Sequence, residues 1–279
     1  MIPASWMAVS KARQVTLAEV QALDGVYDIW VPAELSSVFT TSGGSTNCVA
    51  TDPVGRMESL KTGSTRHFIQ ATAGSRPTLT LGGGRYYLSF DASNDSMAVA
   101  SSTALYKFLH DCTGGYIMAA VSVGSTLDPD DIYMIITTSG DYSPNIGFSF
   151  FYDDRVSVPR NNRFICRSAR GVISTSTYSL ISDDGDFNPT IPVVIEYGPG
   201  TNGATQKIDS TETATSLKLY TESTASATYN LTLGYNPYDS SAYADMKFYG
   251  AVVFNKTPSE FSIRRARRYL GQLSGVVFP

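Results

Sequence analysis

Apolar residues along this chain fall in short runs, and several of these runs alternate with polar positions. Tyr229, Leu231, Leu233 and Tyr235 share one face of such a run, while residues 230, 232 and 234 share the other. A period of two is typical of a strand with one face on the core and one in water. On this basis we predict strands over residues 67–72, 78–81, 86–90, 116–124, 132–138, 146–152, 163–170, 191–197, 213–220, 229–235 and 246–254.

Residues that favour chain reversal separate these runs. The strongest turn signals are Gly82-Gly83-Gly84, Ser93-Asn94-Asp95, Pro129-Asp130-Asp131, Asp183-Asp184-Gly185 and Gly198-Pro199-Gly200. About a dozen short strands without alternating helices favour an all-β, antiparallel sandwich over a parallel α/β sheet. The Ser/Thr-rich stretch 210–228 still alternates at Thr215, Leu217 and Leu219, so we interpret it as a strand followed by a hairpin connection.

Helices are predicted only near the two ends of the sequence. Residues 10–24 form a candidate helix in which Thr16 and Glu19 make a capping box and Gly25 ends the helix. Near the other end, Thr257, Pro258, Ser259 and Glu260 suit a helix start.

The predicted C-terminal helix is amphipathic. One side gathers Ile263, Ala266, Tyr269, Leu270 and Leu273, and the opposite arc carries Arg264, Arg265, Arg267 and Arg268. We expect the apolar side to dock on the sandwich. The arginine arc is either a solvated face or a contact for an anionic partner.

Composition and charge narrow the class of partner. Charged residues make up 16% of the chain, below the ~25% usual for soluble domains. The net charge of −4 and the absence of long basic runs argue against nucleic acid or an anionic membrane as partner.

No stretch resembles a secretory signal or a membrane span, so we expect synthesis in a cytoplasm without export. Cys48, Cys112 and Cys166 are expected to be free thiols.

No complete catalytic motif is present in the sequence. None of the seven glutamates lies five residues from another, which excludes the Glu-x-Asp-x-x-Glu strand of jelly-roll glucanases. His67 and His110 are the only histidines, and no Gly-x-Ser-x-Gly elbow accompanies them. We therefore predict no enzymatic activity and no catalytic residue.

Metal and cofactor binding are not expected either. Two acidic turns, Asp128/Asp130/Asp131 and Asp183/Asp184/Asp186 with Asn188, match no complete Ca²⁺ loop, although a bound Ca²⁺ remains the alternative to ordinary solvated turns.

Several short motifs occur in an order that resembles one known family. They are YLSFDASNDSM (87–97) after Arg76-Pro77, LTLG (231–234), MKFYGAVVFN (246–255) and a capped helix ending RYLG (268–271). Together they resemble laminin-G-like domains of the concanavalin A-like superfamily over residues 26–273, with Ala92 where that family has glycine. The upstream segments IWVPA (29–33), DPVG (52–55) and QAT (70–72) resemble versions found in tailed-phage virion proteins. The resemblance implies a two-sheet jelly roll but no single activity.

Two functional hypotheses follow. The first is a non-enzymatic virion protein of a tailed phage (a capsid decoration, head-fibre or tail-associated subunit) that is homo-oligomeric and contacts capsid or tail proteins. In it, residues 1–25 form a docking arm anchored by Trp6 and Met7, and residues 26–279 form the jelly-roll domain.

The alternative is a carbohydrate- or host-receptor-binding module, with rim tyrosines as candidate contacts (Tyr142, Tyr152, Tyr178, Tyr238 and Tyr243), although the sequence does not assign the glycan-binding residues. A glycan hydrolase is the third and least supported reading.

Overall fold

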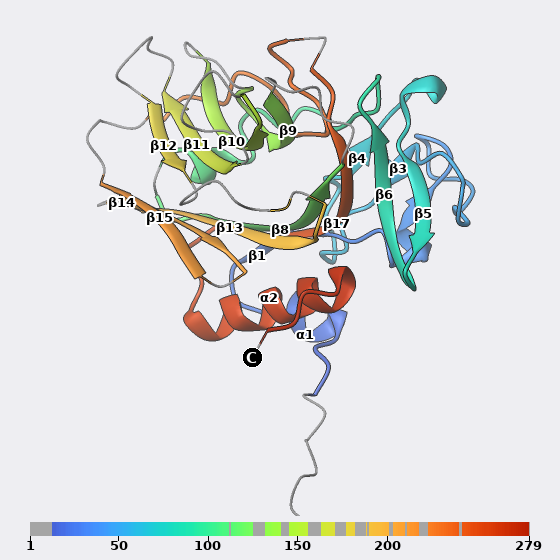
Figure 1. Ribbon diagram of the computed structural model, residues 1–279, viewed down its shortest axis with the longest axis horizontal. Coiled ribbons are helices and arrows are strands. Elements are labelled where there is room, and N and C mark those ends of the chain that lie inside the picture. Colours follow the sequence, from blue (N-terminus) through green and yellow to red (C-terminus); the bar gives the residue numbers. More distant parts are fainter. Residues whose placement is uncertain are drawn as a thin grey trace, which may run out of the picture.

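The computed structural model describes residues 13–111, 113–124, 132–140, 145–155, 163–170, 177–181, 188, 190–200, 203–209, 211–217, 223–239 and 242–278. These residues form two antiparallel sheets that pack face to face, with two helices against the outer face of one sheet (Figure 1). The predicted all-β antiparallel sandwich with a C-terminal amphipathic helix is confirmed.

The first sheet, sheet A, has eight strands in the order β15-β14-β13-β8-β17-β6-β5, and β1 also pairs with β17. Every described pairing in it is antiparallel. Its strands are β1 (Val26–Trp30), β5 (Thr78–Gly82), β6 (Arg85–Asp91), β8 (Tyr116–Val123), β13 (Val193–Gly200), β14 (Gly203–Ile208), β15 (Thr211–Leu217) and β17 (Asp245–Phe254).

The second sheet, sheet B, has nine strands in the order β12-β11-β10-β9-β16-β7-β4-β3-β2. Several of them are only two or three residues long, and all described pairings are antiparallel. Its strands are β2 (Val38–Phe39), β3 (Arg56–Met57), β4 (Phe68–Ile69), β7 (Met97–Val99), β9 (Ile132–Thr137), β10 (Ile146–Asp153), β11 (Arg163–Arg170), β12 (Thr177–Ile181) and β16 (Thr232–Leu233).

The main core fills the space between the two sheets. Aromatic rings contribute much of its volume. The ring centres of Phe148 and Tyr197 lie 5.0 Å apart across the sandwich, and those of Trp30 and Phe68 lie 4.7 Å apart. Edge-to-face and tilted ring pairs of this kind add about 0.5–1.5 kcal/mol beyond the burial of their surface.

A second core lies between sheet A and the helices. Alternate residues of β8 face the two cores: Ile117 and Ala119 face sheet B, whereas Met118 and Ala120 face the helices. All eight positions of β8 are buried as a result, which explains why this strand reads as a continuous apolar run in the sequence.

The helices are α1 (Leu17–Gln21) and α2 (Glu260–Ser274), and three short 3₁₀ turns are η1 (Leu35–Ser37), η2 (Ala73–Ser75) and η3 (Lys107–Leu109). The predicted capping box of α1 is present, since Thr16 accepts from the amide of Glu19 and the Glu19 side chain accepts from the amide of Thr16. Ser259 caps α2, and Gly275 ends it in the left-handed conformation at φ 90°. Both helices lie below sheet A in Figure 1, on the side away from sheet B.

Some predicted strand limits differ from the structure. Within the run 229–235, only Thr232–Leu233 forms a strand. Gly234 adopts φ 77° and turns the chain after it, and before it the Leu231 amide donates to the hydroxyl of Ser102. The turn predicted at 198–200 lies inside β13, where Pro199 pairs with Ala204. The turn at 82–84 is confirmed, with positive φ at Gly83 and Gly84.

Candidate functional site

The C-terminal helix is fixed to sheet A by a buried charge cluster. Arg267 donates through Nε and Nη2 to the two carboxylate oxygens of Glu196 on β13, the second at 2.9 Å. The Tyr116 hydroxyl on β8 donates to the same carboxylate at 2.7 Å. All three residues are buried. A paired and fully hydrogen-bonded charge is the form in which an ion pair is tolerated in a protein interior.

This cluster corrects one sequence prediction. Arg267 does not lie on the exposed arc of α2, and it is not accessible to a partner. The reason is its position one turn after Ile263, which is itself buried against sheet A. Arg264 and Arg268 are exposed and Arg265 is partly exposed, as expected.

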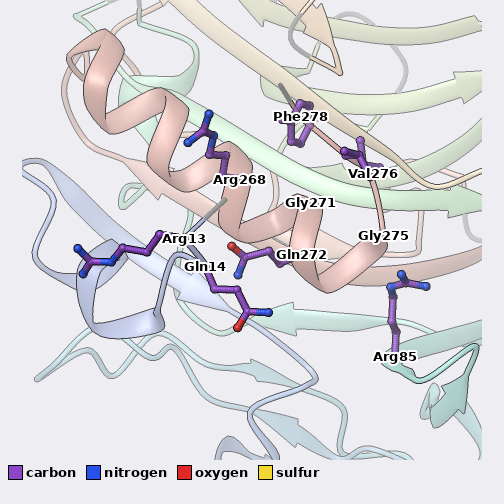
Figure 2. A pocket seen from close by; sticks show the side chains of 10 residues that line it. Arg13, Gln14, Arg85, Arg268, Gly271, Gln272, Gly275, Val276 and Phe278 are labelled. Atoms are coloured by element: carbon purple, nitrogen blue, oxygen red, sulfur yellow. The ribbon is translucent and has the colours of Figure 1, made fainter. Parts of the chain in front are cut away.

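The residues after α2 fold back along the helix. A Cβ at Gly271 would come within 2.6 Å of the Val276 carbonyl and 2.7 Å of the Phe278 ring, so only glycine allows the tail to pack here. At the end of the helix, the Arg85 guanidinium from the β5–β6 turn lies against Gly275, where a Cβ would meet its Cζ at 2.5 Å. The tail and Arg85 therefore meet at one end of α2 (Figure 2).

A hollow in two adjoining compartments extends along α2 from its first turn to the tail, and we call it the arginine hollow. The tail compartment, of about 300 Å³, is lined by Arg13, Gln14, Arg85, Arg268, Gly271, Gln272, Gly275, Val276, Val277 and Phe278. The helix compartment, of about 350 Å³, is lined by Arg13, Phe261, Arg264, Arg265 and Arg268. Arg13 and Arg268 line both compartments, so the two are parts of one site.

The segment before α1 forms one wall of the hollow. Val15 is buried in the second core, and both of its backbone polar groups bond to the side chain of Gln272 on α2. Figure 2 shows Gln272 on the side of α2 that faces this segment. The anchor at Val15 places Arg13, two residues earlier, at the hollow.

Glu19 is an acidic residue that contacts two of these arginines. One of its oxygens lies 3.0 Å from Arg13 and 3.2 Å from Arg265. The hydrogen bond from the Thr16 amide is the main cause that lowers the pKa of the Glu19 carboxyl; burial opposes it, and the charges of Arg13 and Arg265 lower the pKa further. Glu19 thus remains an anion and holds two of the five arginines.

The chemistry of the hollow suits an anionic ligand. Five guanidinium groups lie around it, and Arg264 forms no ion pair within the described part of the chain. Guanidinium groups bind carboxylate, sulfate and phosphate oxygens through paired N–H donors. On a chain with a net charge of −4, this gathering of positive charge is local and marks one pole of the molecule.

Candidate catalytic groups near β1 serve a structural network. Buried Asp28 accepts hydrogen bonds from Ser59 at 2.6 Å, from Arg66 at 2.7 Å and from Tyr106 at 2.9 Å. The His67 ring accepts a hydrogen bond from the backbone amide of Ser59. It bonds neither to the Ser59 hydroxyl nor to Asp28, so the three residues do not form a Ser-His-Asp relay.

Metal-binding side chains do not gather in the described residues: no group of three or more His, Cys, Asp or Glu side chains there could hold an ion. The Asp residues of both predicted acidic turns lie outside the described part of the chain, so binding of Ca²⁺ there stays untested.

Cys48 and Cys166 are buried free thiols, and burial raises the pKa of Cys48 to about 12; Cys112 lies outside the described residues. Within the described chain, neither helix has the length and hydrophobicity to cross a bilayer.

The tyrosines proposed as glycan contacts have different surroundings. Tyr152 is fully buried and belongs to the core, which removes it as a rim contact. Tyr238 is 48% exposed, and Tyr243 stacks on Tyr235 with ring centres 5.0 Å apart. Tyr142 and the side chain of Tyr178 lie outside the described part, as do Trp6 and Met7, whose docking role stays a prediction.

Sequence reasoning found the arginines of α2 but missed the other half of the hollow. Arg13, Arg85 and Phe261 had no signal in the sequence, because their proximity depends on how distant segments pack. Glu19 was recognised only as a capping residue. Its second role, as the carboxylate between Arg13 and Arg265, follows from the packing of α1 on α2.

Comparison with known proteins shows the fold alone. No known protein family and no curated protein sequence matches the chain. Among solved structures, it is similar to Trypanosoma rangeli sialidase in complex with 2-keto-3-deoxy-D-glycero-D-galacto-2,3-difluoro-nononic acid (TM-score 0.53, 9% identity, 89% of this chain and 33% of that one).

It is also similar to botulinum neurotoxin type C, whose cell entry depends on interaction with two ganglioside molecules (0.53, 10%, 91% and 53%), and to the binding domain of botulinum neurotoxin DC in complex with SialylT (0.52, 11%, 90% and 52%). The chain spans a third to about half of the length of these proteins. At 9–11% identity the likeness establishes the β-sandwich fold alone and carries no activity with it.

Proposed function

We propose that this protein is a non-enzymatic β-sandwich module that binds an anionic glycan in the arginine hollow. The observation that carries this proposal is the lining of the helix compartment: four arginines around one exposed phenylalanine. Guanidinium groups bind an acidic substituent, and an aromatic ring packs against the C–H face of a sugar. A ligand with both features is an acidic sugar.

The fold neighbours support the glycan part of the proposal. The sialidase binds a nononic acid, which is a sugar with a carboxyl group, and the type C neurotoxin interacts with gangliosides. These ligands belong to those proteins. They make acidic sugars the first class to test, because they are bound by proteins that contain the same sandwich.

The setting of the protein forms a second part of the proposal. We place it on the virion of a tailed phage as a homo-oligomeric decoration, head-fibre or tail-associated subunit in contact with capsid or tail proteins and without nucleic acid or membrane partners. The support is the ordered set of motifs between residues 26 and 273. Val15 and Val20 belong to the second core, so the deletion that tests this placement stops before them, at residue 12. Removal of residues 1–12 should release the subunit from particles, and unchanged particle association would contradict this placement.

The absence of catalysis is also proposed. Its support is that two buried carboxylates which could act as acid or base are engaged elsewhere: Glu196 by Arg267 and Tyr116, and Asp28 by Arg66 and Tyr106. Hydrolysis of an acidic oligosaccharide by the purified protein, measured as release of reducing sugar, would contradict the absence of catalysis.

The binding proposal is tested by calorimetric titration of the purified chain with acidic oligosaccharides and with neutral ones of the same length. We expect acidic sugars to bind preferentially, with affinity that falls as salt rises. The double variant Arg264→Ala/Arg268→Ala should weaken binding by at least about tenfold, the loss of more than 1.4 kcal/mol. Lys107→Ala, which removes a partly exposed cation from η3 outside the hollow, is the matched control. Equal binding of neutral and acidic sugars, or wild-type affinity in the double variant, would overturn the proposal.

A further inference from the structure

We infer that the arginine hollow binds two acidic groups of one oligosaccharide at the same time, one in each compartment. This inference rests on the proposed function and specifies its ligand: a glycan with acidic substituents on neighbouring sugars. The observations are the division of the hollow into two parts, the different chemistry of their walls, and the arginines that the parts share.

The helix compartment has the features of a site for one acidic sugar ring. Phe261 is 55% exposed, although it lies within the first turn of a helix that buries its other large apolar side chains on sheet A. The Arg265 guanidinium lies over the Phe261 ring, 5.2 Å from its centre. Arg264, Arg265 and Arg268 therefore present donors beside an aromatic surface, where a pyranose could stack while its acidic group is bound.

The tail compartment combines a cation with a different apolar wall. Arg85 stands at one end against Gly275, and the wall is formed by Val276, Val277 and Phe278 of the tail, of which Val277 is 90% exposed. The polar groups of Gln14 and Gln272 complete the lining. This compartment can hold a second acidic sugar and bury its apolar face on the tail.

Arg13 and Arg268 line both compartments and so separate the two anionic groups by positive charge. Two carboxylates on adjacent sugars repel each other in free solution, and guanidinium groups between them remove that cost. Each compartment, at about 300–350 Å³, is at the lower end of the range for ligand pockets, ~300–1,000 Å³. Each therefore fits one sugar residue better than a longer chain.

Nucleic acid fits these observations less well. Sequence-independent binding to a phosphate backbone needs an extended basic track and a favourable overall charge, whereas this chain has a net charge of −4 and the arginines of the hollow form a compact cluster. We therefore propose the glycan, and duplex DNA serves as a competitor in the test.

The experiment uses ligands with two, one or no carboxyl groups: disialic acid and digalacturonic acid, their monomers, and lactose. Two variants each remove one compartment, Arg85→Ala for the tail compartment and Arg264→Ala for the helix compartment, with Lys107→Ala as control. Both arginines are exposed, so circular dichroism should report an unchanged fold.

We expect at least one diacid to bind with one molecule per chain and at least about tenfold more tightly than its monomer, and the monomer to bind with two molecules per chain. Each variant should lower the diacid affinity to that of the monomer and halve the stoichiometry of the monomer. If acids bind better than lactose but diacid and monomer bind alike, the two-group inference fails and the proposed function stands. If acids show no advantage over lactose, the proposed function fails. Tighter binding of duplex DNA than of either diacid would overturn the glycan assignment.

Discussion

The side chain of Gln272 forms a two-way hydrogen-bonded pair with the backbone of Val15. The Val15 amide donates to Oε1 at 2.7 Å, and Nε2 donates to the Val15 carbonyl at 2.9 Å. The two residues are 257 positions apart in the sequence. The pair holds the segment before α1 on α2, so one glutamine on the helix determines where Arg13 stands in the arginine hollow.

Substitution of this glutamine should therefore weaken ligand binding without direct loss of charge. In Gln272→Ala, exchange of the Val15 amide hydrogen should become about fivefold faster, because a hydrogen bond of about 1 kcal/mol is lost. Affinity for an acidic oligosaccharide should fall severalfold as Arg13 becomes less ordered. Hydrogen exchange read by NMR and calorimetric titration measure the two effects. Slow exchange at Val15 in the variant would show that the side chain does not hold this segment.

Removal of the internal carboxylate should have the opposite effect on affinity. Glu19→Gln frees the guanidinium groups of Arg13 and Arg265 from a competing anion, so an acidic ligand should bind severalfold more tightly, most clearly at low salt. Glutamine preserves the capping box with Thr16, so the stability of α1 should change little. Comparison with Glu58→Gln, at a carboxylate that pairs with Arg56 on sheet B, controls for the change in overall charge. Weaker binding by Glu19→Gln would mean that Glu19 organises the arginines for the ligand.

The buried pair of Glu196 and Arg267 gives a prediction for stability. Glu196→Gln leaves the Arg267 charge buried without compensation and should lower the free energy of unfolding by about 3–5 kcal/mol, and Arg267→Met should cost a similar amount. The double variant should lose clearly less than the sum, with a coupling of about 2–3 kcal/mol. Urea denaturation of the four proteins measures the cycle. Strict additivity would show that the two side chains do not interact in solution.

Asp95 makes stability depend on pH. Burial, and next the charge of Asp91, raises the pKa of the Asp95 carboxyl to about 7, from an ordinary value of 3.8. Between about pH 4 and pH 7 the folded state therefore holds a proton that the unfolded state has released, so the free energy of unfolding falls as pH rises through this window and levels off above it.

The slope from this group is at most about 1.4 kcal/mol per pH unit. Asp95→Asn should flatten this part of the profile and raise stability near pH 8 relative to the wild type, as measured by urea denaturation at a series of pH values. Asp24→Asn, at a carboxyl that is 84% exposed, should leave the profile unchanged. An equal slope in Asp95→Asn and wild type would contradict the prediction.

Much of the fold could be predicted because it is encoded locally. The strand-favouring run Arg163–Arg170 and the triple glycine at 82–84 each specify one element without reference to the rest of the chain, and both were predicted within a residue. Strands of two residues, such as Arg56–Met57 and Phe68–Ile69, could not be predicted in the same way. Their ladders exist because neighbouring strands hold them, and two residues are too few to show a period.

The candidate site was harder to predict for a related reason. Arg264, Arg265 and Arg268 could be recognised because a helix fixes which residues share its exposed face. Arg267 was misplaced because a cation on a helix flank is usually solvated, and the buried partner that changes this, Glu196, lies 71 residues earlier in the chain. Glu196 stands within the apolar run 191–197, and an acidic residue in such a run is the signal that could have led to a buried pair.

The arginine hollow joins Arg13 with Phe278, so its walls come from opposite extremes of the described chain. The hollow exists only while both extremes are packed against sheet A, as Val15 and Phe278 are. Ligand-binding capacity should therefore be lost when either extreme leaves the sheet, and it reports on whether both are intact.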